Sequence, residues 1–397
     1  MAAVGPCRES RDGARAGRPP VTRRRVAVVG AGIGAEHLEG WIGAAARVEV
    51  AAVCDLDAAR AAPLVARARE AGFDARHASD LDAVLADASI EVVDLCLPPS
   101  LHREAILRCL AAGRHVVCEK PLVASLAECD EVVAAEAASG RRVMPVFQYR
   151  FGAGFDALRR LIDLGLAGTP LVATLETHWS RDADYYAVPW RGRWASELGG
   201  AIVGHAIHAH DLLCCAFGPV AAVQASLATR ANPIEVDDCA AIAFTMVSGA
   251  LASSSVTLGA SGDRSRLKLC FSGLTAESGS APYHPAGDGW RFEARAPASD
   301  RAAAQAAIDA AVAATGGGSA GGGAVPGERY ARQFALFARA LDEGGEPPVT
   351  VADARASLEL ITAMYASHAR GVRVALPLGA DDPGYAGWGP APEEGAG

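Results

Sequence analysis

Three features are missing from this 397-residue chain, and each absence excludes a class of function. No two of its ten cysteines are spaced as C-x-x-C, so neither a zinc ribbon nor a thioredoxin-like motif is present. No uncharged apolar run reaches the roughly 18 residues needed to span a bilayer. The net charge is −9, which gives no broad cationic surface for nucleic acid or an anionic membrane. We therefore expect a cytoplasmic protein with reduced thiols, without a nucleic-acid or membrane partner.

Three segments lack the apolar periodicity of a packed core. Residues 1–24 contain six arginines among Gly, Ala and Pro and predict a disordered tail, with a transit-like segment as the alternative. Residues 296–326 combine an Ala tract with a Gly-rich stretch and predict a flexible insertion. Residues 379–397 are rich in Gly, Pro and acidic residues and predict a loose tail.

The rest of the chain divides into two domains of the α/β and α+β classes. In residues 25–148, short apolar runs alternate with helix-length segments, as in a doubly wound parallel sheet. The runs are 26–29, 48–53, 92–97, 115–118 and 143–147. Residues 149–378 instead show hairpin-like spacing, which predicts a mainly antiparallel sheet. Two helices are expected to follow that sheet, at 328–341 and 351–369.

A glycine-rich segment predicts a dinucleotide site. Gly30-Ala-Gly32-Ile33-Gly34 directly follows the first strand and opens a helix. Gly30 permits a tight turn, and Gly32 lets the backbone approach a pyrophosphate at the helix N-terminus. The second strand ends at Asp55, whose carboxylate can bind an adenosine ribose and would repel a 2′-phosphate. NAD is therefore favoured over NADP; the alternative is a simple tight turn with Asp55 as a helix cap.

Two further strand ends carry residues that suit this site. Leu97-Pro98-Pro99 forms a stiff loop that either lies beside the dinucleotide or only ends the strand. Glu119-Lys120 follows the strand at 115–118. A lysine partly desolvated there can have its pKa lowered into the range of proton transfer. The residues alone equally allow a Glu119–Lys120 surface ion pair.

The second domain offers a histidine-rich segment. Glycines before a helix allow the backbone to approach a ligand, and Gly199-Gly200 precede this one. His205, His208 and Asp211 follow at three-residue intervals, which predicts one helical face. A histidine there can move a hydroxyl proton while an acidic neighbour fixes its tautomer. Metal binding by these residues is the alternative, but no second ligand pair is apparent, and we predict no metal.

Three other side chains suit a carbohydrate. Trp190 can stack on a sugar ring, although core packing is the more common role of a tryptophan. Arg191 and Arg150 can bind a carboxylate or hydroxyl groups through the guanidinium fork. We therefore expect these residues, with His205 and Asp211, to contact substrate.

Five motifs cover most of the chain. They are Gly30-Ala-Gly32-Ile33-Gly34-x-x-His37, Pro98-Pro99-Ser-Leu-His102, Gly113-Arg-His115-Val-Val-Cys-Glu119-Lys120-Pro121, Tyr149-Arg150-Phe151 and Gly199-Gly200-(x)7-His208-x-x-Asp211. Together they resemble the glucose–fructose oxidoreductase, myo-inositol dehydrogenase and MocA family. The resemblance implies a Rossmann domain followed by a large open sheet whose exposed face supports homo-oligomers. It also implies Lys120 and His208 as catalytic residues, and we add Ile33, His102, Glu119 and Lys120 to the expected cofactor contacts.

One departure from the family pattern bears on mechanism. The position four residues before His208 is Gly204, where the family often has an acidic or amide residue. We expect Lys120 and His208 to supply the acid–base chemistry, with assistance from His205. The resulting prediction is an NAD(H)-dependent oxidoreductase acting on a CH–OH or C=O group of a sugar, polyol or sugar derivative. Its alternatives are a redox-neutral glycosidase or epimerase that retains NAD, and a non-catalytic NAD-binding regulator.

Overall fold

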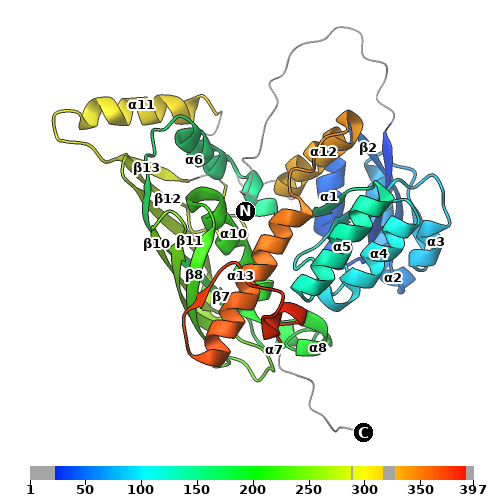
Figure 1. Ribbon diagram of the computed structural model, residues 1–397. Coiled ribbons are helices and arrows are strands. Elements are labelled where there is room, and N and C mark those ends of the chain that lie inside the picture. The colour runs from blue at the N-terminus through cyan, green and yellow to red at the C-terminus, as the bar shows by residue number, and fades with distance from the viewer. Residues whose placement is uncertain (1–22, 288, 316–326, 390–397) are drawn as a thin grey trace. The chain divides into compact units, whose positions relative to one another are not determined.

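The computed structural model describes residues 23–287, 289–315 and 327–389, and these form two compact units (Figure 1). The first unit holds the described residues up to Leu122, together with Cys129–Gln148 and those from 327 to Ala354. The second holds Val123–Glu128, the described residues between Tyr149 and 315, and those from Arg355 onward.

A six-stranded parallel sheet forms the centre of the first unit, in the order β3-β2-β1-β4-β5-β6. Its strands are β1 (Arg24–Val29), β2 (Val48–Cys54), β3 (Arg76–Ala78), β4 (Val92–Leu95), β5 (His115–Cys118) and β6 (Val143–Pro145). Most of these strand residues are apolar and buried, because helices cover both faces of a parallel sheet. The strand order reverses between β1 and β4, and ligands of such sheets bind beside the carboxyl ends of the strands at this point.

The helices of the first unit are α1 (Gly34–Gly43), α2 (Ala58–Glu70), α3 (Leu81–Leu85), α4 (His102–Ala111), most of α5 (Leu126–Ser139) and α12 (Glu328–Glu343), with a 3-10 turn η1 (Pro99–Leu101). Right-handed crossovers put α1 and α2 on one face of the sheet and α4 and α5 on the other. The sequence predicts that residues 328–341 belong to the second domain. They instead form α12, which packs on α1 in the first unit.

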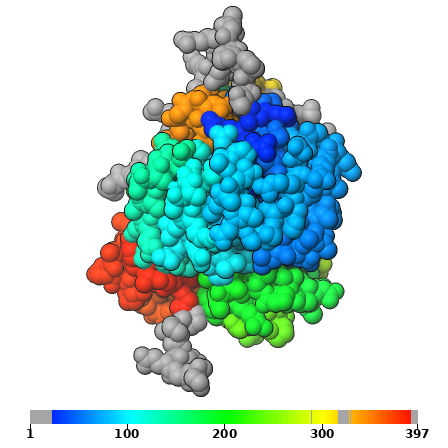
Figure 2. All heavy atoms as spheres, turned by 90° about the vertical axis from the view of Figure 1, so that its right-hand side faces the viewer, coloured from blue at the N-terminus to red at the C-terminus, as the bar shows by residue number. Residues whose placement is uncertain are grey.

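Packing and charge explain this position of α12. Phe334 stacks on Trp41 at 4.2 Å between ring centroids. Asp342 forms ion pairs with Arg24 and Arg47, at 3.0 and 2.9 Å. Figure 2 shows the orange side chains of α12 beside the dark blue ones of the first strand. A helix late in the sequence thus completes the layer that contains α1.

An eight-stranded sheet forms the second unit, in the order β13-β12-β11-β7-β10-β9-β8-β14. Its strands are β7 (Pro170–Ser180), β8 (Val220–Ala228), β9 (Cys239–Met246), β10 (Leu251–Thr257), β11 (Gly259–Phe271), β12 (Leu274–Glu277), β13 (Arg291–Ala294) and β14 (Val374–Ala375). Only β10 and β7 pair in parallel; the other pairs are antiparallel. The predicted fold class is therefore confirmed. Inward Ile242 and Phe244 alternate with exposed Ala241 and Ala243, so one face of this unit's sheet is open.

The remaining helices are α6 (Ala153–Asp163), α7 (Ala183–Tyr186), α8 (Trp194–Glu197), α9 (Ala201–Gly204), α10 (Ile207–Phe217), α11 (Arg301–Ala313) and α13 (Val351–Arg370), with 3-10 turns η2 (Gln148–Phe151) and η3 (Pro383–Ala386). Within the described residues, no single helix is long and apolar enough to cross a membrane. The bent pair Trp194–Gly204 and Ile207–Phe217 meets the length and composition requirement jointly.

Two segments expected to be loose contain ordered structure. The Ala-rich part of 296–326 forms α11, which buries Ile308 and contacts α6, because alanine favours a helix and the apolar side chains gather on one side. Near the C-terminus, Trp388 is buried and its Nε1 donates a hydrogen bond to the Leu198 carbonyl at 2.6 Å. Residues 1–22, 316–326 and 390–397 of the predicted loose segments lie outside the described residues.

Candidate functional site

The glycine loop after β1 leads into the N-terminus of α1 through a tight turn. Gly30 has φ +102°, and a Cβ there would lie 2.4 Å from the Cys96 carbonyl oxygen, so only glycine fits. Ile33 is the N-cap residue of α1, and its apolar side chain accepts no capping hydrogen bond. No described residue accepts a hydrogen bond from the Gly32 or Ile33 amide. Such N–H groups at a helix N-terminus fit the pyrophosphate of a dinucleotide.

Asp55 lies at the end of β2 beside this loop. Its carboxylate accepts hydrogen bonds from the amides of Ala31 and Asp57, at 2.9 and 3.0 Å. Arg60 Nη1 lies 3.9 Å from the same carboxylate. Asp55 thus holds the glycine loop to the second strand. Each carboxylate oxygen can accept a further hydrogen bond, as from a ribose hydroxyl. The expected ribose contact stays a prediction.

His102 links the loop after β4 to the segment after β5. Its Nδ1 lies 2.8 Å from the Pro121 carbonyl oxygen, and its Nε2 lies 2.9 Å from that of Leu97. Burial lowers the pKa of His102, and the neutral ring donates to only one of these carbonyls. Because the ring is fully buried, His102 could affect a bound cofactor only by holding these two loops in position.

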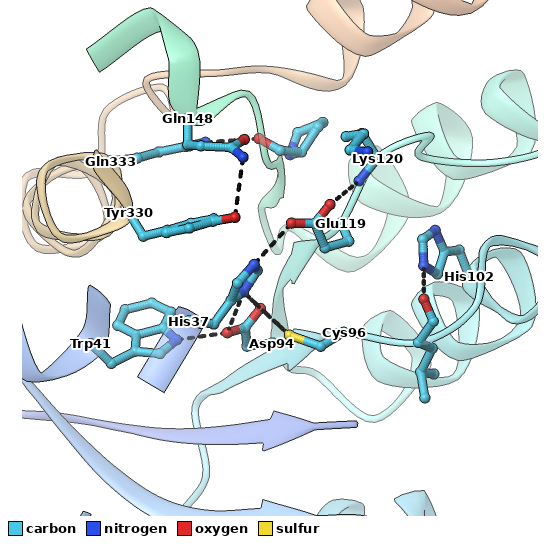
Figure 3. A network of polar contacts seen from close by, with 12 residues as sticks. His37, Trp41, Asp94, Cys96, His102, Glu119, Lys120, Gln148, Tyr330 and Gln333 are labelled. Carbon is cyan, nitrogen blue, oxygen red and sulfur yellow. Dashed lines mark hydrogen bonds and ion pairs between the residues drawn. The ribbon is translucent and has the colours of Figure 1, made fainter. Parts of the chain in front are cut away.

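A buried charged network joins α1 to the strand ends (Figure 3). His37 Nδ1 lies 3.0 Å from both carboxylate oxygens of Asp94, and its Nε2 lies 3.0 Å from Glu119 Oε1. Burial by itself lowers the pKa of His37, but the charge and hydrogen bond of Asp94 outweigh it and raise this pKa well above its ordinary value. Trp41 Nε1 also donates to Asp94, at 2.7 Å. His37 is therefore an imidazolium between two carboxylates.

The network ends at the predicted catalytic lysine. Glu119 Oε2 accepts a hydrogen bond from the Lys120 backbone amide at 3.0 Å, while Oε1 is held by His37. Glu119 is 6% exposed, so a solvent-exposed Glu119–Lys120 pair does not describe this site. These two contacts hold Glu119 in place and with it the backbone at half-buried Lys120, just after the end of β5.

Helix α12 closes the other side of the network. The Tyr330 ring lies 4.7 Å from the His37 ring, between centroids, and its hydroxyl accepts from Gln148 Nε2 at 3.1 Å. Gln333 Nε2 donates to the Pro145 carbonyl at the end of β6, at 2.9 Å. Figure 3 shows both α12 side chains above His37. The sequence gives no sign of this contact, because α12 is expected in the other domain.

His37, Asp94 and Cys96 also have the composition of a metal site, with donor atoms within 4.8 Å of one another. Metal ligands must be deprotonated. Here burial raises the pKa of Cys96 to about 12, and His37 Nδ1 faces Asp94 as a donor. In the metal-free protein, hydrogen bonds among His37, Asp94 and Cys96 therefore hold these three side chains together.

In the second unit, α10 carries two of the predicted site residues. The buried His208 ring stacks on Tyr149 at 4.5 Å. Asp211 binds Arg150 through two hydrogen bonds, of 2.8 and 2.6 Å. This pair explains why both side chains can be nearly buried, and their contact with substrate stays a prediction.

Two expectations about the histidine segment are wrong. His205 does not share a helical face with His208: α9 ends at Gly204, a poor helix former, and His205 lies in the break before α10. The glycines before α9 make room for the protein itself rather than for a ligand. A Cβ at Gly200 would lie 1.8 Å from the Asp237 carbonyl oxygen. The Asp237 carboxylate then accepts from the amides of Gly200 and Ile202.

A group of aromatic and arginine side chains, which we call the aromatic–arginine cluster, lies beside His205. It consists of Trp179, Arg181, Tyr185, Trp190, Arg191 and Tyr283. The Tyr185 hydroxyl lies 3.3 Å from His205 Nε2. Trp190 and Arg191 were expected at the site. Trp179, Arg181 and Tyr185 lie nearby in the sequence but were not singled out, and Tyr283 comes from a distant segment that sequence spacing could not connect to them.

Glu197 is a further residue that the sequence did not single out. It is buried at the end of α8 and accepts a hydrogen bond from the Gly192 amide at 2.5 Å. A Cβ at Gly204 would lie 3.8 Å from Glu197 Oε1. A carboxylate from α8 therefore lies beside the position where the expected acidic or amide side chain is missing.

Two family models match the chain. The model of the oxidoreductase family with an NAD-binding Rossmann fold matches residues 24–147. The Gfo/Idh/MocA C-terminal domain model matches residues 155–276. The chain belongs to the Gfo/Idh/MocA oxidoreductase family. The family predicted from the motifs is thereby confirmed, as is an NAD-binding first domain.

Individual relatives agree with this assignment. Inositol 2-dehydrogenase 3 of Saccharopolyspora erythraea is 37% identical over 155 residues, which cover 38% of this chain and 43% of that protein. The match thus spans less than half of this curated relative. The WlbA dehydrogenase of Bordetella pertussis, solved with NADH and UDP-GlcNAcA, is 29% identical with a TM-score of 0.75, covering 91% of this chain and 100% of that one. Levoglucosan dehydrogenase, solved with NADH and levoglucosan, has a TM-score of 0.73 at 22% identity, covering 90% and 100%, and shares the fold.

Proposed function

We propose that this protein is an NAD-dependent dehydrogenase that oxidises a carbinol group of a sugar, polyol or sugar derivative, or reduces the matching carbonyl. The observation that carries the proposal is the placement of Lys120 at the carboxyl end of β5, clamped through Glu119 by the His37 imidazolium. The dehydrogenase names of the relatives and their carbohydrate ligands support the substrate class.

The cofactor is held by residues of the first unit in this proposal. The amides of Gly32 and Ile33 would bind the pyrophosphate, and Asp55 the adenosine ribose. Leu97, Pro98 and Pro99 would border the dinucleotide. Asp55 favours NAD because its charge repels a 2′-phosphate. When bound, NAD accepts the hydride that leaves the substrate carbon.

The chain's own residues handle the proton. Lys120, with His208, would take the proton of the substrate hydroxyl as the carbon loses hydride, and return it in the reverse direction. The stack of His208 on Tyr149 fixes the plane of that ring. His205, Trp190 and Arg191, and the Arg150–Asp211 pair, would contact or position the carbohydrate. The open face of the second sheet would join copies of the chain into a homo-oligomer.

Nicotinamide absorbance tests the proposal directly. Purified protein is mixed with NAD or NADP and a panel of inositols, aldoses, sugar acids and deoxy-sugars. We expect reduction of NAD with at least one carbohydrate. Tight NAD binding without net reduction, combined with release of a glycosidic leaving group or epimerisation, would contradict a dehydrogenase and identify a redox-neutral enzyme.

A further inference from the structure

The two arginines at the centre of the aromatic–arginine cluster differ in how their charge is balanced. Arg181 Nη1 lies 3.0 Å from Asp263 Oδ2, and its Nη2 donates to the Tyr283 hydroxyl at 2.8 Å. Arg191 has no such partner: within residues 23–287, 289–315 and 327–389, no carboxylate lies within 4.0 Å of its guanidinium. Its Nε is buried and has no hydrogen-bond acceptor among those residues. The guanidinium of half-buried Arg191 thus forms no direct ion pair with a carboxylate of those residues.

The environment of Arg191 limits how that anion can approach. The guanidinium carbon lies 3.9 Å from the Tyr185 ring centroid and 4.6 Å from that of Trp190. Aromatic rings that cover a guanidinium plane leave its N–H edge for hydrogen bonding. A carboxylate fits that edge with two parallel hydrogen bonds. Stacking also restricts the side chain, so less conformational entropy is lost when an anion binds.

The charges around Arg191 favour an anion of a single charge. Asp263 already neutralises Arg181. The carboxylate of Glu197 acts on Arg191 from beyond ion-pair distance. One cation with an acidic neighbour suits a monoanion, whereas a phosphate ester brings nearly two negative charges.

The cluster also touches the proposed catalytic segment. Tyr185 contacts Arg191 with its ring and His205 with its hydroxyl, and His205 lies three residues before His208. A ligand group at Arg191 would therefore lie in the same unit as the proposed catalytic histidine and be connected to it through two side chains.

We propose that Arg191 binds a carboxylate of the substrate, so that the preferred substrate is a sugar acid. This inference rests on the proposed function, which places carbohydrate at this segment. It assigns the aromatic–arginine cluster the role of distinguishing a sugar acid from its neutral counterpart.

Matched pairs of sugars test the assignment. D-glucuronate is compared with D-glucose, D-galacturonate with D-galactose, and glucose 6-phosphate serves as the phosphate probe. Two measurements are made: reduction of NAD, and calorimetric titration of each sugar into the NADH-loaded protein, where oxidation cannot proceed. We expect an acid to be preferred over its neutral partner by about 10- to 100-fold, the range of one charge-assisted contact.

Three variants isolate the contribution of Arg191. Arg191→Gln should bring the acid-to-neutral ratio close to one. Arg191→Lys, which keeps the charge but not the fork, should keep part of the preference. Arg193→Gln removes an exposed arginine two residues away and should keep all of it.

Each outcome decides one proposal separately. Arg191-dependent binding of an acid without NAD reduction would support the carboxylate site and contradict the dehydrogenase. Turnover of neutral sugars, with no acid preference or with a preference that survives Arg191→Gln, would support the dehydrogenase and overturn the carboxylate site. A stronger Arg191-dependent preference for glucose 6-phosphate, or no Arg191-dependent binding of either acid, would overturn it as well.

Discussion

The charged network of the first unit and the aromatic–arginine cluster of the second treat buried charge in opposite ways. In the network, the His37 imidazolium is bound on both nitrogens by carboxylates of the same unit. In the cluster, the Arg191 cation is covered by aromatic rings and forms no ion pair within 4.0 Å with a carboxylate of the described residues; Glu197 acts on it only from farther away. The ion pairs and hydrogen bonds of His37 fix the positions of Asp94 and Glu119. Arg191 has no such ion pair within the described part of the chain, so its guanidinium can bind a ligand anion. The comparison separates positioning from recognition within one protein.

The largest expected effect belongs to the residue that the network positions. Lys120→Met removes the amine but keeps the backbone amide that Glu119 binds, so the clamp should remain. We expect turnover of the best substrate to fall by about 10²- to 10⁴-fold, the usual contribution of general acid–base catalysis. The measurement is kcat from nicotinamide absorbance. Lys268→Met, at the other lysine of the chain, is the matched control; wild-type turnover in Lys120→Met would refute the role.

A smaller but still large effect is expected on stability when the network loses its cation. His37→Gln leaves Asp94 and Glu119 buried without their charged partner, and breaking such a buried pair costs about 3–5 kcal/mol. Urea unfolding of wild type and variant measures this difference in the free energy of unfolding. An unchanged unfolding midpoint would mean that the network is not charged.

The pH dependence of stability sharpens the same comparison. The folded pKa of His37 is raised, so its stabilisation is complete below the unfolded value near 6.5 and is lost as the pH rises through the folded pKa. His37→Gln should remove that loss. His210 is the matched control, because burial lowers its pKa to about 4. Its protonation destabilises the fold only as the pH falls below 6.5, so His210→Gln should leave the alkaline side unchanged.

The smallest effect concerns the choice of cofactor. Asp55→Asn removes the charge that the proposal places beside the adenosine ribose and leaves the exposed Arg60, 3.9 Å from that carboxylate in the wild type, available to a 2′-phosphate. We expect the preference for NAD over NADP to fall by about 10- to 100-fold. The ratio of kcat/KM for the two cofactors measures it. Asp57→Asn, at an exposed acid two residues away, should keep the wild-type ratio; an unchanged ratio in Asp55→Asn would remove Asp55 from cofactor selection.

Local patterns predicted the fold better than they predicted the site. The first-unit strands show as apolar runs because both faces of their sheet are covered, except β3, whose Arg76 and His77 are exposed. The glycine loop and Glu119-Lys120 could be found because each is a short run of consecutive residues directly after an apolar strand.

What the sequence could not predict depends on contacts between distant segments. Asp94 is a single acid within an apolar run, and its partner His37 is 57 residues away. Helix α12 was expected in the other domain because nothing in its sequence indicates Trp41 as its partner. The aromatic–arginine cluster likewise includes Tyr283, which lies 102 residues after its partner Arg181. Asp94 still offered a signal, since an ionisable side chain in a buried strand needs a partner.

Isotope transfer tests the central claim most directly. The carbohydrate that reduces NAD fastest is prepared with deuterium at its carbinol carbons, and the NADH formed is analysed by mass spectrometry and NMR. A dehydrogenase predicts one deuterium at C4 of the nicotinamide ring in each NADH released, and almost none formed by Lys120→Met. NADH without deuterium, or deuterium that returns to the product while NAD stays bound, would contradict the account.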